Sequence, residues 1–307
     1  MAGFLLGYRK MSLKPYDKPH LSYDDQVQLF VKRGLLVRDL KAAAEFLSRV
    51  SYYRLSAYRF PFLQQNDLFL PGTSFEQLTR LYKLDDALRQ AFICALSPIE
   101  IYLRTRVTYQ LTAKYGPFVQ YDPSVFRSTF DHAKWVQAVE IEIVRGHETF
   151  LDHFKSKYSG FPRLPLWMAV EVMSFGSISK LYGGLLPDPQ RSISSIFGIH
   201  HSVLHNWMHA LTYVRNVCAH HSRLWNRELA IRPEIPRKAA EWQKIHIDNT
   251  RIFSIAAVVD WITTKALLPS PAIEKMFSVI DEIQKQGSRF PAFMGIPSDV
   301  QLRPLWK

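Results

Sequence analysis

The chain has 307 residues, of which 47% are hydrophobic, and its 39 lysine and arginine residues against 27 aspartate and glutamate residues give a net charge of +12. This composition excludes intrinsic disorder and allows a proper core, while the positive balance favours acidic partners, of which nucleic acid is the commonest. Because Cys94 and Cys218 are the only cysteines, the sequence also excludes a disulfide framework and a cysteine-based zinc site.

Apolar runs in the sequence are short. The longest near the N-terminus covers residues 4–6, and the apolar stretch 255–259 is flanked by charged side chains. Neither is long enough for a signal-peptide core or a membrane span. We therefore expect a soluble protein of a reducing compartment, the cytoplasm, with no membrane partner.

Helix signals follow one another along the first hundred residues, without a convincing strand pattern. The N-terminal signals are Ser22, Asp39, the capping box Ser74 with Gln77, and the capping box Ser97 with Glu100. The last of these has Pro98 at the first helical position, and it predicts a new helix that ends at Gly116.

The rest of the chain continues the helical pattern. Helices are predicted at 131–158, from 167, at 201–227 and, after the break at 233–236, near 237–247, 250–268 and 272–286. The fold class is therefore all-α. We divide the chain into an N-terminal tail (1–21), a helical domain (22–232), and C-terminal helices with a proline-rich tail packed on the same body (233–307).

The candidate catalytic residues lie in the segment 213–227, YVRNVCAHHSRLWNR. A helix turning about 100° per residue would place on one polar face Arg215, Asn216, His220, Arg223 and Asn226. The opposite face would collect the apolar side chains together with His221. The two adjacent histidines thus receive different predictions, provided that the helix continues unbroken through the segment.

An arginine and a histidine on one face suit cleavage of an RNA phosphodiester. An imidazole such as that of His220 can relay a proton from the ribose 2′-hydroxyl or to the leaving oxygen. The guanidinium of Arg215 stays charged and donates to charge that develops at phosphorus. No metal or other cofactor is required. The spacing alone is not specific, since a surface arginine and a histidine near a helix end also occur together by chance.

The same segment resembles known families. Arg215-Asn216-x3-His220 resembles the Rx4-6H signature of HEPN ribonucleases, and RNVCAHHSRLWNR resembles the AbiD/AbiF type of the Abi family of phage abortive-infection proteins. Further resemblance to the Abi family lies in the segments Gln28–Phe62, Phe75–Arg89, Ile99–Arg104 and Pro165–Gly176 and in the closing MGIP and PLW. In all, the resemblance extends over roughly residues 22–306.

The resemblance implies a HEPN-like helical bundle with additional N-terminal helices and a C-terminal extension. It also implies metal-independent endoribonuclease activity that leaves a 2′,3′-cyclic phosphate, a homodimer formed through the motif helix, and in some members a structured non-coding RNA partner. Carried onto this chain, Arg215 and His220 are catalytic, and Asn216 orients His220 or contacts the phosphate.

Other residues are assigned to RNA binding or to support of the site: Arg223, Asn226, Arg227, Glu100, Arg104, Arg54 and Arg59. For Arg223 and Asn226 a contact across a dimer is an equal alternative. Glu100 and Arg104 lie four residues apart and either pair on their helix or support the active helix. The aromatic and basic stretch 52–59 is typical of RNA-binding surfaces and also of a tyrosine-rich core.

Three further interpretations stay open but are less favoured. His205 and His209 have the spacing of two metal ligands on a helix, but no third ligand is evident, so we predict a polar helix face and no metal. Residues 33–39 between two helices allow a helix-turn-helix that binds DNA, although no recognition helix is visible. The second function class is a non-catalytic HEPN-type RNA scaffold or a toxin–antitoxin component.

Overall fold

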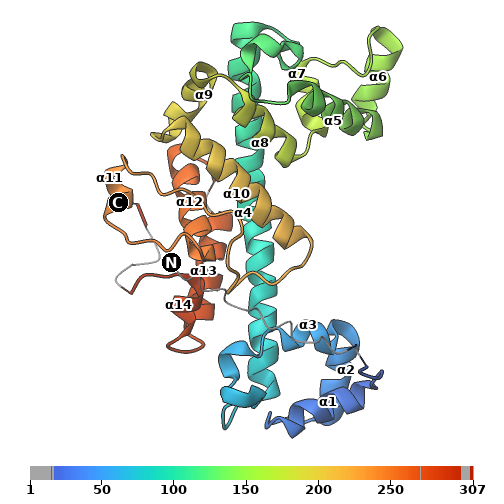
Figure 1. The fold of residues 1–307 in the computed structure, drawn as a ribbon, viewed down its shortest axis with the longest axis vertical. Helices are drawn as coiled ribbons and strands as arrows, with labels where there is room; N and C mark the ends of the chain where they lie inside the picture. Colours follow the sequence, from blue (N-terminus) through green and yellow to red (C-terminus); the bar gives the residue numbers. More distant parts are fainter. Residues whose placement is uncertain (1–14, 16, 270, 299–304, 307) are drawn as a thin grey trace, which may run out of the picture. The chain divides into compact units, whose positions relative to one another are not determined.

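The computed structural model describes residues 15, 17–269, 271–298 and 305–306 (Figure 1). Over these residues it contains α- and 3₁₀-helices, and extended pairing is limited to isolated bridges, which confirms the all-α prediction. The chain forms two compact units, Met1–Thr79 and Arg80–Lys307. Most of the predicted N-terminal tail lies outside the described residues, as does part of the predicted C-terminal tail.

The first unit is built from three helices and the start of a fourth. These are α1 (Tyr23–Lys32), α2 (Leu40–Val50), α3 (Tyr52–Ser56) and the first residues of α4 (Phe75–Tyr115). The side chains of Ser22 and Asp39 accept hydrogen bonds from backbone N–H groups in the first turns of α1 and α2, so both predicted caps are confirmed. Phe30 lies at the centre of the unit, where its ring contacts those of Tyr52 and Phe69.

Helix α4 begins as predicted but does not stop where the sequence suggests. The backbone N–H of Ser74 donates to the side chain of Gln77 at 2.8 Å, which confirms the first capping box. The predicted new start at Ser97 is wrong, because α4 continues through Pro98 to Tyr115. A proline inside a helix costs about 3 kcal/mol, and the fully buried Ile99 and its apolar neighbours on α4 offset that cost. Gly116, with φ 87°, ends the helix.

The second unit contains the remainder of α4 and ten further α-helices among the described residues. Their bounds are α5 (His132–Arg145), α6 (Thr149–Lys157), α7 (Leu166–Val172), α8 (Phe175–Gly184), α9 (Pro187–Ser194), α10 (His201–Ala219), α11 (Ala240–Gln243), α12 (Ile252–Lys265), α13 (Pro271–Gln284) and α14 (Phe290–Met294).

Outside the motif segment, two predicted helices of this unit are shorter than expected. The single helix predicted over 131–158 is wrong, because it is divided at Gly146, whose backbone is extended. A Cβ at that position would lie 2.7 Å from Leu151, so the first turns of α6 pack directly on the break. The helix predicted near 237–247 is reduced to α11.

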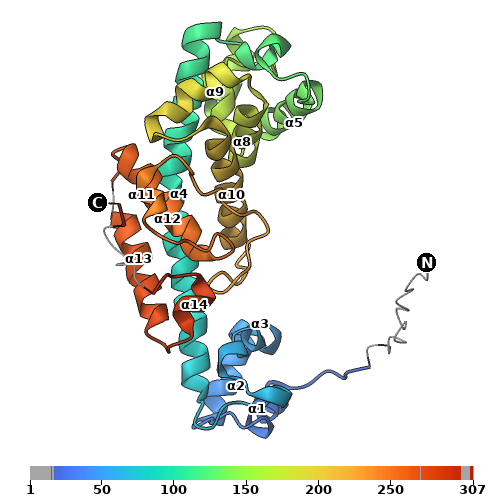
Figure 2. The same ribbon diagram turned by 60° about the vertical axis from the view of Figure 1, so that its left-hand side comes forward.

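The core of the second unit lies around α12, whose residues from Ile252 to Thr263 are all buried. Figures 1 and 2 show α12 between α10 and α13. A cluster of indole rings closes this core: Trp242 contacts Trp207, Trp261 and Trp306 with centroids 4.5–5.8 Å apart. Helix α10 is therefore held by a rigid apolar layer on its inner side.

None of the helices in the described part of the chain combines the length and apolarity that a membrane crossing needs.

Candidate functional site

The motif residues lie at the C-terminal end of α10. The inner side of the helix is buried, including Val214, Val217 and Cys218 in its last turns. Arg215 and Asn216 belong to the same turns and are exposed. Over this stretch, exposure and burial therefore follow the helical period as predicted, with polar side chains in solvent and apolar side chains in the core.

The helix ends at this point instead of continuing to residue 227. His220 is the C-cap, and His221 adopts a left-handed conformation with φ 53°. The backbone N–H of His221 donates to the carbonyl of Cys218, and that of Ser222 donates to the carbonyl of Val217, both at 3.0 Å. These two bonds are the Schellman ending of a helix, in which glycine usually holds the left-handed position. The predicted helix over 201–227 is therefore wrong beyond Ala219.

The predicted exposure is correct for one of the two motif histidines and wrong for the other. His220 is exposed, as predicted, whereas the prediction that His221 faces the core is wrong, because its side chain is also exposed. The reversal at His221 takes the chain out of the helical period, so the wheel no longer assigns faces after His220. A left-handed conformation costs a residue other than glycine about 1–2 kcal/mol, and this strain lies directly beside His220.

Asn216 is bonded to Arg215 through its side chain and to His220 through an ordinary helical backbone bond. Its side-chain oxygen accepts a long hydrogen bond of 3.5 Å from Nη1 of Arg215. Its backbone carbonyl accepts the backbone N–H of His220 at 3.0 Å. The last turn of α10 thus presents a guanidinium, an amide and an imidazole to solvent within six residues. Such a set can bind a phosphate and transfer a proton without a metal.

The remaining predicted residues of the segment lie in the loop after the helix. Arg223 and Asn226 therefore do not extend the polar face of α10, and the prediction that they do is wrong. The carbonyl of Asn226 accepts a hydrogen bond from Arg251 at 2.9 Å. Nε of Arg227 donates to the carbonyl of Arg223 at 2.8 Å. These bonds stabilise the loop itself.

A buried ion pair on α4 also holds this loop, and its residues are not among the site residues predicted from the sequence. The Asp85 side chain is fully buried, pairs with Arg89, and accepts the backbone N–H groups of Leu224 at 3.1 Å and Trp225 at 2.7 Å. One signal could have revealed it. Asp85 and Arg89 are charged residues within the otherwise apolar pattern of an α4 face that includes Leu81 and Leu88.

The Cys218 thiol is buried in the last turns of α10. Burial, together with the negative charge of Asp85, raises the pKa of the Cys218 thiol to about 12. The thiol therefore stays protonated at neutral pH and acts as a small apolar side chain of the core.

Glu100 and Arg104 form the pair that their spacing suggests. Nη2 of Arg104 lies 3.0 Å from a carboxylate oxygen of Glu100 and also donates to the carbonyl of Met173 at 3.1 Å. The pair thus connects α4 to the end of α7. Arg54 and Arg59 belong to the first unit, where Arg54 is exposed on α3 and Arg59 pairs with Asp67 at 3.3 Å.

His205 and His209 both have exposed surface on α10, but the His205 ring is partly covered by α8. In the described part of the chain, no group of three or more histidine, cysteine, aspartate or glutamate side chains could hold a metal ion. The His205 ring packs against α8, where a Cβ added to Gly183 would lie 2.1 Å from its Nε2. This burial, with smaller contributions from His209 and Arg127, lowers the pKa of His205.

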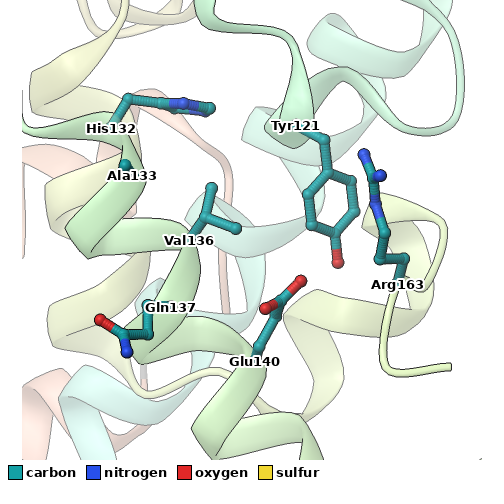
Figure 3. Close-up of a pocket in the computed structure, with 7 residues that line it drawn as sticks. All are labelled: Tyr121, His132, Ala133, Val136, Gln137, Glu140 and Arg163. Carbon is teal, nitrogen blue, oxygen red and sulfur yellow. The ribbon is translucent and has the colours of Figure 1, made fainter.

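A cavity of about 330 Å³ elsewhere in the second unit contains none of the predicted site residues. Figure 3 shows its lining: Tyr121, His132, Ala133, Val136, Gln137, Glu140 and Arg163. The Arg163 guanidinium lies 4.5 Å from the centre of the Tyr121 ring. Burial, and secondarily the negative charge of Glu140, raises the pKa of the Tyr121 hydroxyl, so it stays protonated.

A comparison with known protein families matches residues 45–226 to the model described as Abi-like protein. The matched residues are more than half of the chain, and they include the motif of α10 and the ion pair of α4. Searches of curated proteins and of solved structures gave no match. From the family match, the chain belongs to the Abi-like protein family.

Proposed function

We propose that this protein is a metal-independent endoribonuclease of the HEPN type that acts in phage defence by abortive infection. The observation that carries the proposal is the exposure of Arg215, Asn216 and His220 together at the end of a helix whose other side is buried. Membership of the Abi-like family supports the role in abortive infection. The resemblance to the AbiD/AbiF type supports it further.

In the proposed reaction, the 2′-oxygen of a ribose attacks the adjacent phosphorus, and the bond from phosphorus to the 5′-oxygen breaks. The 2′-hydroxyl gives up its proton and the leaving 5′-oxygen takes one, so the products are a 2′,3′-cyclic phosphate and a 5′-hydroxyl. His220 performs one of these proton transfers. Arg215 stabilises the charge that develops on the phosphate oxygens.

One chain supplies one His220, whereas the reaction needs both an acceptor and a donor of protons. A homodimer in which two motif helices face each other would supply both. We therefore propose that two copies form the complete site. Light scattering tests this proposal: an active preparation that is monomeric at micromolar concentration would contradict it.

Asn216 fits a supporting role in this scheme. Its side-chain oxygen accepts a hydrogen bond from Nη1 of Arg215 and so lies beside that guanidinium. Substitution of Asn216 with alanine should therefore lower the rate less than substitution of either neighbour, since neither charge nor imidazole is lost.

The net charge of +12 supports RNA as the partner. Phosphate contacts release counterions, so the affinity for RNA should fall steeply between low and physiological salt. A nearly flat salt titration would show that the basic surplus does not form the binding surface.

The experiment that tests the function is incubation of the purified protein with a labelled generic RNA in EDTA. Cleavage that persists in EDTA and yields 2′,3′-cyclic phosphate ends supports the proposal. Binding of RNA without cleavage would contradict it and would favour the non-catalytic scaffold. Cleavage that EDTA abolishes would contradict the metal-independent mechanism.

A further inference from the structure

A buried carboxylate of α4 anchors the loop that follows His220. Asp85 accepts hydrogen bonds from two consecutive backbone N–H groups, those of Leu224 and Trp225, across more than 130 residues of sequence. Arg89, only 2% exposed, supplies the opposite charge. A buried carboxylate needs such partners, because an unpaired charge in the interior is strongly unfavourable.

This anchor lies close to His220 along the chain. Only residues 221–223 separate His220 from Leu224, and the first of them already has the left-handed conformation that closes α10. The backbone on the other side is fixed as well, since the ring of Trp225 stacks on that of Phe290 with centroids 5.2 Å apart. His220 therefore stands at the junction of a rigid helix and a short, anchored loop.

The last turn of α10 is held by packing, because Cys218, two residues before His220, is buried. The loop after His220 is held by the buried pair of Asp85 and Arg89. An apolar pair of similar volume could pack at this place, but it could not accept two backbone N–H groups.

We propose that Asp85, held by Arg89, is a positioning residue that fixes the backbone after α10 and thereby orients His220 for proton transfer. This inference rests on the proposed function. Its expected effect is large, because a misplacement of about 1 Å in a catalytic group can lower the rate about 100-fold.

The chain offers a matched control in Asp86. Its carboxylate also pairs with Arg89, at 2.7 Å, but it is 41% exposed, and its described hydrogen bonds go to Arg89 and Gln90. Asp85→Asn and Asp86→Asn thus each remove one negative charge beside Arg89. They differ in that Asp85 Oδ1 and Oδ2 also accept backbone N–H groups of the loop, so only Asp85→Asn replaces one of the oxygens that hold it.

The experiment measures two properties of both variants: hydrogen–deuterium exchange of peptides covering 201–217 and 220–227, and the kcat and KM for RNA per folded molecule. For Asp85→Asn we expect faster exchange in 220–227 alone, a kcat about 100-fold lower, and an unchanged KM. Asp86→Asn should resemble the native protein in each measurement. A third variant, Leu211→Ala, lowers stability from the middle of α10 and should keep its kcat per folded molecule.

Each outcome decides the inference. If exchange in 220–227 does not change in Asp85→Asn, or if kcat falls no more than in Asp86→Asn or Leu211→Ala, Asp85 is not a positioning residue. If Asp85→Asn does not fold, Arg89→Lys keeps the charge but loses the planar fork, and the same exchange and kcat changes are expected. If the native protein cleaves no RNA, the proposed function fails, and the exchange data alone decide whether Asp85 holds the loop.

Discussion

Residues 213–219 and residues 220–227 together carry the proposed site, but different interactions hold the two stretches. The first stretch is the end of α10, where backbone hydrogen bonds are local and exposure follows the helical period. The second is a loop whose backbone is bonded by Asp85 and Arg251, which are distant in sequence. His220 lies at the boundary between them.

In our proposal, packing of the helix and the remote ion pair act on different residues of one site. The apolar side of α10 fixes where Arg215 and Asn216 stand. The α4 ion pair fixes the path of the chain immediately after His220. Variants that affect only one of the two stretches should therefore have separable effects on stability and on activity.

The largest expected effect belongs to the exposed residues themselves. Arg215→Ala and His220→Ala should each lower RNA cleavage by about 100- to 10,000-fold or more, because they remove charge stabilisation and proton transfer. Both side chains are exposed, so the free energy of unfolding should change by less than about 0.5 kcal/mol. Cleavage in EDTA beside thermal melts measures both properties. His209→Ala, which removes an exposed histidine earlier on α10, is the control, and full activity in His220→Ala would reject the proposed catalytic role.

The second effect compares the two stretches directly through a pair of leucines. Leu211 lies in the middle of α10 and Leu224 in the loop, and both are fully buried. Truncation of either to alanine should lower the free energy of unfolding by about 2–5 kcal/mol, measured by chemical denaturation. Only Leu224→Ala should also lower the rate per folded molecule. Equal rates in the two variants would show that the loop does not orient His220.

A smaller gain in stability is expected at the helix end. His221→Gly should raise the free energy of unfolding by about 0.5–1 kcal/mol, because glycine adopts a φ of 53° without a Cβ clash. His221→Ala retains the Cβ and should bring no such gain. Chemical denaturation of both variants measures the difference. A glycine variant less stable than the alanine variant would show that backbone strain at His221 does not limit the stability of the helix end.

The sequence predicts those parts of the fold that depend on neighbouring residues. The caps at Ser22, Asp39 and Ser74 and the exposure of Arg215 and Asn216 all follow from spacings of a few residues. The continuation of α4 through Pro98 does not, since it results from burial of the helix on both sides of the proline.

The end of α10 could not be predicted for a related reason. Glycine is the usual signal for a left-handed helix end, and here His221 occupies that position. The loop beyond it depends on Asp85, which lies more than 130 residues earlier in the chain. A helical wheel contains no information on such a partner. The charged residues within the apolar pattern of α4 are the one local indication of it.

The smallest expected effect is the pH dependence of stability that arises from histidines on α10. Burial of His205 against α8, with lesser contributions from His209 and Arg127, lowers its pKa from the ordinary value of 6.5. The unfolded chain therefore binds more protons than the folded protein just below pH 6.5, so stability is complete above that pH and falls as the pH decreases toward the folded pKa. His201, whose pKa is lowered mainly by burial, contributes with the same sign.

Thermal melts between pH 7.5 and 5 of the native protein and of His205→Asn measure this effect. The asparagine variant should lose less stability over the same interval, because the side chain that takes up the proton is absent. His209→Asn is the control for loss of an exposed histidine on the same helix face. Equal slopes for the native protein and His205→Asn would show that the packing of α8 against α10 does not depend on a neutral His205. Since His205 lies away from the loop, the pH profile of cleavage should not change in this variant.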